Sequence, residues 1–166
     1  MGHDWGTSWQ VGAPRRVALL GVGPRALALY VQATRPGYAQ LVSEIERELP
    51  TLVPTELPLP EETDLEVMIG DARVHLAALG ERTFDVIVLD VFSGQDSPAQ
   101  LAEAAFYAEA LAHLGTAGLL LVNVGDDAGQ RFLSAQVREL ETAAADAGVP
   151  GVWTLTDAQL LTRPAD

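Results

Sequence analysis

Four groups of residues in this chain combine glycine or carboxylate chemistry with the same position, directly after a short apolar run. The groups are Gly21–Val22–Gly23, Glu44, Gly70–Asp71–Ala72 and Asp90. In an open parallel sheet the carboxyl ends of the strands meet at one edge, and ligands bind there near the point where the strand order reverses. We therefore expect the four groups to form one site if the apolar runs are parallel strands.

The glycines of Gly21–Val22–Gly23 allow a ligand to approach the backbone, and the helix that follows directs its first amide groups at the same place. A tight turn from strand to helix needs the same residues without any ligand, so both interpretations remain open. The dinucleotide-binding fingerprint is incomplete, because Ala26 stands where a third glycine is usual.

Glu44 ends the second apolar run, about 20 residues beyond the glycine turn, as dinucleotide and adenosyl folds require. A carboxylate at this place accepts two hydrogen bonds from ribose hydroxyls. The other interpretation is a solvated charge, since the segment that follows is rich in glutamate. The placement favours ribose binding for Glu44 but not for the neighbouring Glu46.

Asp71 and Asp90 are the remaining carboxylates of this set. Asp71 suits two compatible roles, accepting a hydrogen bond from an adenine amino group or capping the helix that follows it. Asp90 ends the most apolar run, Phe84–Leu89, where a partly desolvated carboxylate suits a general base. The alternative is a cap or turn residue in the loop that leads to Ser93, and the placement favours the site role.

Composition excludes several common kinds of site. The chain has no Cys, which excludes disulfides and thiolate metal sites. Its histidines, His3, His75 and His113, lack metal-ligand spacing, so we expect no metal and an ordinary surface or half-buried place for each. A phosphate-binding loop needs a Lys that the sequence does not contain, and no nucleophile elbow is visible.

The formal net charge is −13 over 166 residues, so phosphate backbones and anionic membrane surfaces would be repelled. We expect neither nucleic acid nor a membrane as a partner. The negative charge mildly favours a cationic substrate. It is more often a feature that keeps a protein soluble. No apolar run approaches the roughly 20 residues of a membrane span. The polar, Trp-containing start, Met1–Val11, is unlike a signal peptide, which makes the cytoplasm the expected location.

Apolar runs alternate with helical stretches, which predicts an α/β fold with a doubly wound, mostly parallel sheet of six to seven strands. The expected strands are 17–20, 40–45, 65–69, 84–89, 119–124 and 152–155. The expected helices are 25–34, 46–57, 72–79, 99–114 and 128–147, with turns at 115–118 and 148. Nothing after Asp157 supplies a clear last strand. We expect a single domain over 17–166, preceded by a lead-in segment over 1–16.

Together these features resemble the spermidine synthase-like (polyamine aminopropyltransferase-like) branch of the class I S-adenosylmethionine-dependent methyltransferase superfamily. The resemblance runs from Val17 to Asp126 and rests on the order and spacing of short motifs. They are Val17–Gly23, Ser43–Glu46, Gly70–Ala72, Asp85–Phe92, Pro98–Leu101, Phe106–Tyr107 and Gly118–Asn123. The family implies a Rossmann-like sheet in the strand order 3-2-1-4-5-7-6.

The resemblance implies that Gly21 and Gly23 lie beneath the nucleoside and its tail. It also implies that Glu44, with Ile45 beside it, binds the ribose, and that Asp71, with Ala72 beside it, binds the adenine. Asp90 matches the aspartate that takes a proton from the attacking amine in aminopropyltransferases. The sequence departs from the family at two places. The family carries an aspartate in the glycine loop, near the place where this chain has Pro24. The family also carries a second aspartate after the fourth strand, where this chain has Ser93.

We therefore expect a transferase that uses S-adenosylmethionine or its decarboxylated form, with no metal, to move a methyl or aminopropyl group to a small nucleophile such as an amine. Asp90 would be the base or an orienting group. The alternative hypothesis is a catalytically degenerate relative that binds the nucleoside, or nothing, and works through a partner or as a homodimer. A nicotinamide-dependent reductase rests on fold-level analogy alone.

Overall fold

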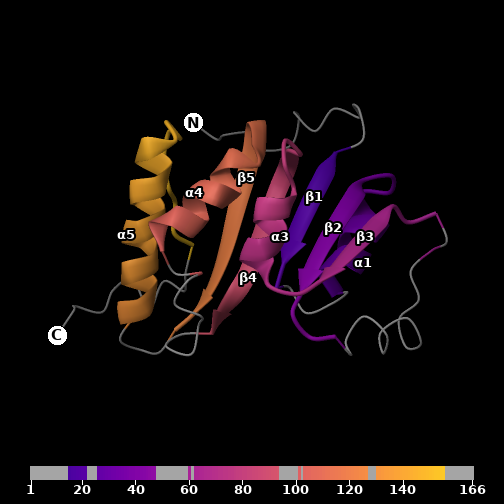
Figure 1. Ribbon diagram of the computed structural model, residues 1–166, viewed down its shortest axis with the longest axis horizontal. Helices are drawn as coiled ribbons and strands as arrows, with labels where there is room; N and C mark the ends of the chain where they lie inside the picture. Colours follow the sequence, from indigo (N-terminus) through magenta and orange to yellow (C-terminus); the bar gives the residue numbers. More distant parts are fainter. Residues whose placement is uncertain are drawn as a thin grey trace, which may run out of the picture.

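The computed structural model describes residues 15–21, 26–47, 60, 62–93, 101, 103–126 and 130–155. The strands are β1 (Arg16–Leu20), β2 (Ala39–Glu44), β3 (Leu65–Ile69), β4 (Phe84–Ser93) and β5 (Leu114–Gly125). The helices are α1 (Ala26–Thr34), α3 (Ala72–Ala78), α4 (Ala104–Ala112) and α5 (Arg131–Asp146). Over these residues strands and helices alternate, except that β3 is the next described element after β2 (Figure 1). None of these described helices is both long and apolar enough to cross a membrane.

The strands form one parallel sheet in the order β3-β2-β1-β4-β5. β1 pairs with β2 on one side and with β4 on the other. The chain therefore builds the sheet outward from β1 in one direction and then returns to its other side, which is the doubly wound α/β arrangement that the sequence predicts. The strand order reverses between β1 and β4, the strands that lead to Gly21 and Asp90.

Helices cover both faces of the sheet, and each face has its own hydrophobic cluster (Figure 1). On one face, residues of α3, α4 and α5 pack together with Ala18 and Leu20 of β1. On the opposite face, α1 packs with Val17 and Leu19 of the same strand. Successive side chains of a strand point to opposite faces, so a central strand covered on both sides is apolar at every position. This explains the unbroken apolar run before Gly21.

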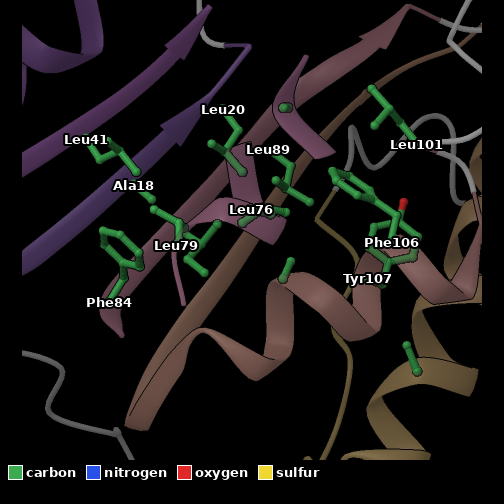
Figure 2. Packing of buried hydrophobic residues seen from close by; sticks show 14 residues of the cluster. Ala18, Leu20, Leu41, Leu76, Leu79, Phe84, Leu89, Leu101, Phe106 and Tyr107 are labelled. Atoms are coloured by element: carbon green, nitrogen blue, oxygen red, sulfur yellow. The ribbon is translucent and has the colours of Figure 1, made fainter. Parts of the chain in front are cut away.

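The larger cluster is the main apolar core (Figure 2). Phe106 and Tyr107 of α4 are fully buried in it, together with Leu76 of α3 and Leu89 of β4. Burying one such side chain contributes about 1.5–3 kcal/mol relative to leaving it exposed. The cluster fixes α3 and α4 on the sheet and thereby fixes the strand ends that carry the predicted site.

Tyr107 brings a hydroxyl into this core, where it donates a hydrogen bond to Gln136 Oε1 of α5 at 2.7 Å. Burial, aided by the negative charge of Glu139, raises the pKa of Tyr107 well above its ordinary value. The folded state therefore holds the phenolic proton more tightly than the unfolded state does. The resulting stability is complete below about pH 10, the unfolded value, and is lost as the pH rises toward the folded value.

We expect Tyr107→Phe to remove this pH dependence. Loss of the hydrogen bond should lower the free energy of unfolding by about 1 kcal/mol at neutral pH. Above about pH 10 the wild-type protein should lose up to about 1.4 kcal/mol more per pH unit than the variant does. Urea melts on both sides of that pH measure the two effects, and equal pH slopes for the two proteins would contradict the raised pKa.

α4 starts later than its sequence pattern predicts. The helix expected over 99–114 is observed as Ala104–Ala112, and residues 94–100 lie outside the described residues. The backbone N–H of Ala104 donates to Glu139 Oε2 of α5 at 3.0 Å, so a carboxylate from another helix satisfies an end group of the first turn. A tertiary contact, which spacing along the helix cannot reveal, helps to set where α4 begins.

Two predictions for the second half of the chain were wrong. The described residues at 152–155 have no regular secondary structure, and Trp153 and Leu155 are exposed. A strand needs a neighbour to satisfy its backbone groups, so apolar composition alone did not make one. The turn expected at 115–118 lies inside β5, where the pairing with β4 changes register. The helix expected over 46–57 falls mostly on residues 48–57, outside the described residues, and stays a prediction.

Candidate active site

The carboxyl ends of four neighbouring strands bring the predicted groups to one edge of the sheet. Gly21 directly follows β1, and Glu44 is the last residue of β2. Asp71 follows β3 and precedes α3, and Asp90 lies near the end of β4. Gly23 lies outside the described residues, so its predicted role is not tested by this geometry.

Backbone hydrogen bonds hold three of these strand ends together. Gly21 N donates to Ser43 O at 2.9 Å, and Gly70 N donates to Glu44 O at 2.8 Å. The hydrogen-bond pattern of the parallel sheet thus continues one residue beyond β1 and β3. The predicted site residues are therefore positioned by the sheet itself rather than by long loops.

Gly21 is required by close approach of another strand. Its φ is +72°, a conformation that favours glycine, and an added Cβ would lie 2.4 Å from Val91 Cγ1 and 3.0 Å from Asp90 O. The end of β4 therefore passes directly beside this residue. The backbone conformation and the close contact together explain why a glycine stands in this tight turn. The predicted role of Gly21 beneath a ligand stays a prediction.

Glu44 is buried at the end of β2, with a relative exposure of 5%. Its Oε1 accepts a hydrogen bond from the backbone N–H of Glu46 at 3.0 Å. Glu46 thus contributes its backbone to the arrangement, and the prediction that its side chain has no special role stays a prediction. Ile45, between them, is exposed at 65%.

Asp71 caps α3. Its Oδ1 accepts hydrogen bonds from Arg73 N at 2.8 Å and from Val74 N at 3.2 Å, so the capping role predicted for it is confirmed. The adenine-binding role is compatible with this geometry and stays a prediction. Ala72, the first residue of α3, is buried in the main core.

Asp90 stands in an irregular part of β4. Leu89 pairs with Val122 and Phe92 pairs with Val124, so β4 advances three residues while β5 advances two. One extra residue is therefore accommodated in β4 at Asp90–Val91, as in a β-bulge. Bulges redirect side chains at strand ends, and they are frequent beside active sites. The sequence gives no sign of this irregularity, because the apolar run continues smoothly into it.

Asn123 of β5 is a functional candidate outside the predicted site residues, although it ends one of the short motifs quoted above. Its Nδ2 donates a hydrogen bond to Asp90 Oδ1 at 2.7 Å. A carboxylate can only accept, so Asn123 must present its amide nitrogen there. One oxygen of Asp90 is thus fixed by a neighbouring strand. An amide inside the otherwise apolar stretch 119–124 was the available signal.

A buried polar pair lies behind these strand ends. Ser43 Oγ and His75 Nδ1 are 2.6 Å apart, and the two residues are 1% and 9% exposed. His75 is therefore more deeply buried than the surface or half-buried place predicted for it. Among the described residues, no three His, Asp or Glu side chains gather as metal ligands would.

Three solved structures show what this architecture is similar to. A probable spermidine synthase from Corynebacterium glutamicum aligns over 78% of this chain and 47% of its own, at 25% identity and a TM-score of 0.71. Human methyltransferase-like protein 13, in complex with SAH, aligns over 90% of this chain and 88% of its own, at 18% identity and a TM-score of 0.62. A spermidine synthase in complex with the transition state analogue AdoDATO aligns over 78% of this chain and 46% of its own, at 15% identity and a TM-score of 0.64. The chain has the class I methyltransferase fold.

Spermidine synthases and class I methyltransferases are thus the structural neighbours of this chain, as its motifs predict. The observed order β3-β2-β1-β4-β5 matches the first five places of the order expected for the class I methyltransferase fold. The chain spans about half the length of the two spermidine synthases, 47% and 46%. No protein-family model matches the sequence, and no curated protein matches it significantly.

Proposed function

We propose that this protein is a transferase that takes S-adenosylmethionine, or its decarboxylated form, as co-substrate and moves a methyl or aminopropyl group to a small nucleophile. The observation that carries the proposal is the gathering of Gly21, Glu44, Asp71 and Asp90 at the carboxyl edge of the sheet, around the switch in strand order. This edge is where parallel α/β sheets bind ligands. The structural neighbours in complex with SAH and AdoDATO support an adenosyl ligand.

The donor half of the site suits an adenosyl nucleoside by its chemistry. Glu44 is a buried carboxylate, and such a group needs hydrogen-bond donors, which ribose hydroxyls supply. Asp71 commits Oδ1 to the cap of α3, so Oδ2 is the atom to accept from an adenine amino group. Ile45 and Ala72 are the proposed neighbours of these two carboxylates, and Gly21 with Gly23 would pass beneath the tail.

Asp90 is the proposed base of the acceptor half. The lone pair of the acceptor forms a bond to the carbon attached to the sulfonium, the carbon–sulfur bond breaks, and its electrons remain on sulfur. The proton released by the acceptor passes to Asp90. Asn123 holds Oδ1 of this carboxylate, which leaves Oδ2 to receive the proton. An amine acceptor suits both this carboxylate and the net charge of −13.

A second candidate function is nucleoside binding without catalysis, through a partner or as a homodimer. The observation that favours it is the missing part of the acceptor half, since Ser93 stands where spermidine synthases are expected to carry a second aspartate. Both functions share the donor half, so the binding of an adenosyl ligand is the first property to test.

Ligand-dependent stabilisation tests the donor half directly. S-adenosylmethionine, decarboxylated S-adenosylmethionine or methylthioadenosine at about 100 times its dissociation constant should add about 2.7 kcal/mol to stability, whereas NAD should add nothing. Glu44→Ala removes the proposed ribose acceptor and should weaken binding by about 30-fold, or ~2 kcal/mol. Melting curves with each compound measure both effects.

Glu46→Ala is the matched control, because the backbone N–H that contacts Glu44 survives this exchange. Its ligand-induced melting shift should equal that of the wild type. No shift with any adenosyl compound would exclude the proposed function, and an unchanged shift in Glu44→Ala would exclude the role of that residue.

A further inference from the structure

We propose that His75 is a positioning residue for the nucleoside half of the site, acting through its hydrogen bond to Ser43. The inference rests on the proposed function, because the residues that His75 would position are the proposed nucleoside ligands Glu44 and Asp71. His75 itself belongs to the middle of α3 and is not a proposed ligand.

The contact joins a helix to the strand end that carries the ribose-binding carboxylate. Ser43 Oγ lies 2.6 Å from His75 Nδ1, and Glu44 is the next residue of β2. Adjacent side chains of a strand point to opposite faces, so Ser43 meets α3 on one face while Glu44 points to the other. Movement of Ser43 would therefore move the backbone that carries Glu44.

The imidazole also packs against the turn that carries Asp71. A Cβ added at Gly70 would lie 3.1 Å from His75 Nε2, and Gly70 has a φ of +148°. The backbone N–H of His75 donates to Asp71 O at 3.0 Å. The ring thus lies against the residue that leads from β3 into the cap of α3, with little room to shift.

His75 therefore links the ends of three strands. Its partner Ser43 accepts from Gly21 N through its carbonyl, and its ring contacts Gly70, whose N–H is bonded to Glu44 O. The spacing between the carboxylates of Glu44 and Asp71 depends on these strand ends. A nucleoside that bridges ribose and adenine contacts would sense a change in that spacing.

Core stability alone does not require this pair. Replacing both partners of a buried hydrogen bond by apolar groups of the same shape is often nearly neutral. Ser43 directly precedes Glu44, and His75 follows Asp71 by four residues. The relative position of the Glu44 and Asp71 carboxylates matters for a ligand that contacts both, and it does not matter for the core. This placement points to positioning as the role of the bond.

The test compares two substitutions at one position. His75→Asn keeps an amide atom at the place of Nδ1 and retains the bond to Ser43, whereas His75→Leu has a similar branch and no polar atom. Titration calorimetry with S-adenosylhomocysteine should show about tenfold weaker binding for His75→Leu, the loss expected for one buried hydrogen bond. His75→Asn should bind within about threefold of the wild type. Ser43→Ala, which removes the other partner, should match His75→Leu and replaces it if that variant does not fold.

His113 provides the matched control for loss of stability. Its Nδ1 lies 2.9 Å from Arg82 O, in the turn just before β4 at the opposite edge of the sheet. His113→Leu removes a histidine hydrogen bond far from the site and should leave the affinity for S-adenosylhomocysteine unchanged. Circular dichroism at the titration temperature shows that each variant is folded.

Three results would overturn the inference. Wild-type affinity in folded His75→Leu and Ser43→Ala shows that the bond positions nothing. Equal weakening in His75→Leu, His75→Asn and His113→Leu shows that affinity follows general stability. Absence of binding by the wild type removes the proposed function, and the inference with it, a result distinct from the first two.

Discussion

Replacing Asp90 with asparagine is expected to slow group transfer to an amine by about 10²- to 10⁴-fold, the usual contribution of a positioned general base. Asparagine has the same shape, and its Oδ1 can still accept the hydrogen bond from Asn123 Nδ2. The substitution therefore removes the proton acceptor without removing the contact that orients it. Binding of S-adenosylmethionine should be unchanged, because Asp90 is the proposed base of the acceptor half. Turnover of labelled donor with putrescine as acceptor measures the rate.

Asp85→Asn is the control for this experiment. Asp85 lies on the same strand at its amino end, where its carboxylate accepts from Arg16 N at 2.9 Å. Its exchange should leave turnover unchanged. A fully active Asp90→Asn would show that the acceptor loses its proton elsewhere. A wild-type protein that binds the donor and transfers nothing to any amine would favour the noncatalytic binding function.

Gly21→Ala is expected to lower the free energy of unfolding by about 2–5 kcal/mol. Left-handed backbone costs an alanine about 1–2 kcal/mol, and overpacking adds about 1–3 kcal/mol. The added Cβ would overlap Val91 Cγ1 and press on the backbone oxygen of Asp90. Domains of this size have a free energy of unfolding of only about 5–15 kcal/mol, so the substitution should remove a large part of it. Chemical denaturation of the purified variant measures the loss.

Gly148→Ala separates the two contributions. Gly148 follows α5 with a φ of +68°, close to the +72° of Gly21, and a Cβ there would meet nothing within 4 Å. This variant should lose about 1–2 kcal/mol from backbone strain alone. If Gly21→Ala lost no more than Gly148→Ala, the close approach of β4 would not be what requires the glycine.

The sequence predicted the first three strands and their carboxyl ends to within one residue, because these depend on local composition. The fourth strand, predicted to end at Leu89, continues to Ser93. A run such as Val17–Leu20 is apolar at every position only if both faces are covered, and Gly21 marks its end. Asp71 was also predictable as a cap, since its oxygen bonds the amides of the next turn. Residues of this kind interact with their neighbours in the chain, so their roles can be inferred from order alone.

Contacts between distant segments could not be predicted in this way. Asn123 meets Asp90 because β4 and β5 are adjacent and pair in a register that sets Leu89, one residue before Asp90, opposite Val122, one residue before Asn123. His75 was interpreted as an ordinary helix residue, since nothing near it in the sequence indicates Ser43 as a partner. Residues 152–155 show the converse, because this mostly apolar stretch suits a strand and yet pairs with none of the strands that the structure describes.

The two register shifts divide the pairing of β4 with β5, whose longest regular stretch lies at the centre, from Val86 to Leu89 opposite Leu119 to Val122. An insertion of one residue in a strand ordinarily turns every later side chain to the other face. In this sheet such a change has already been absorbed at Asp90–Val91, without disturbing Leu89 in the core. The end of β4 that carries Asp90 therefore has its own pairing, Phe92 and Ser93 with Val124 and Gly125, separate from the pairing that keeps Leu89 in the core.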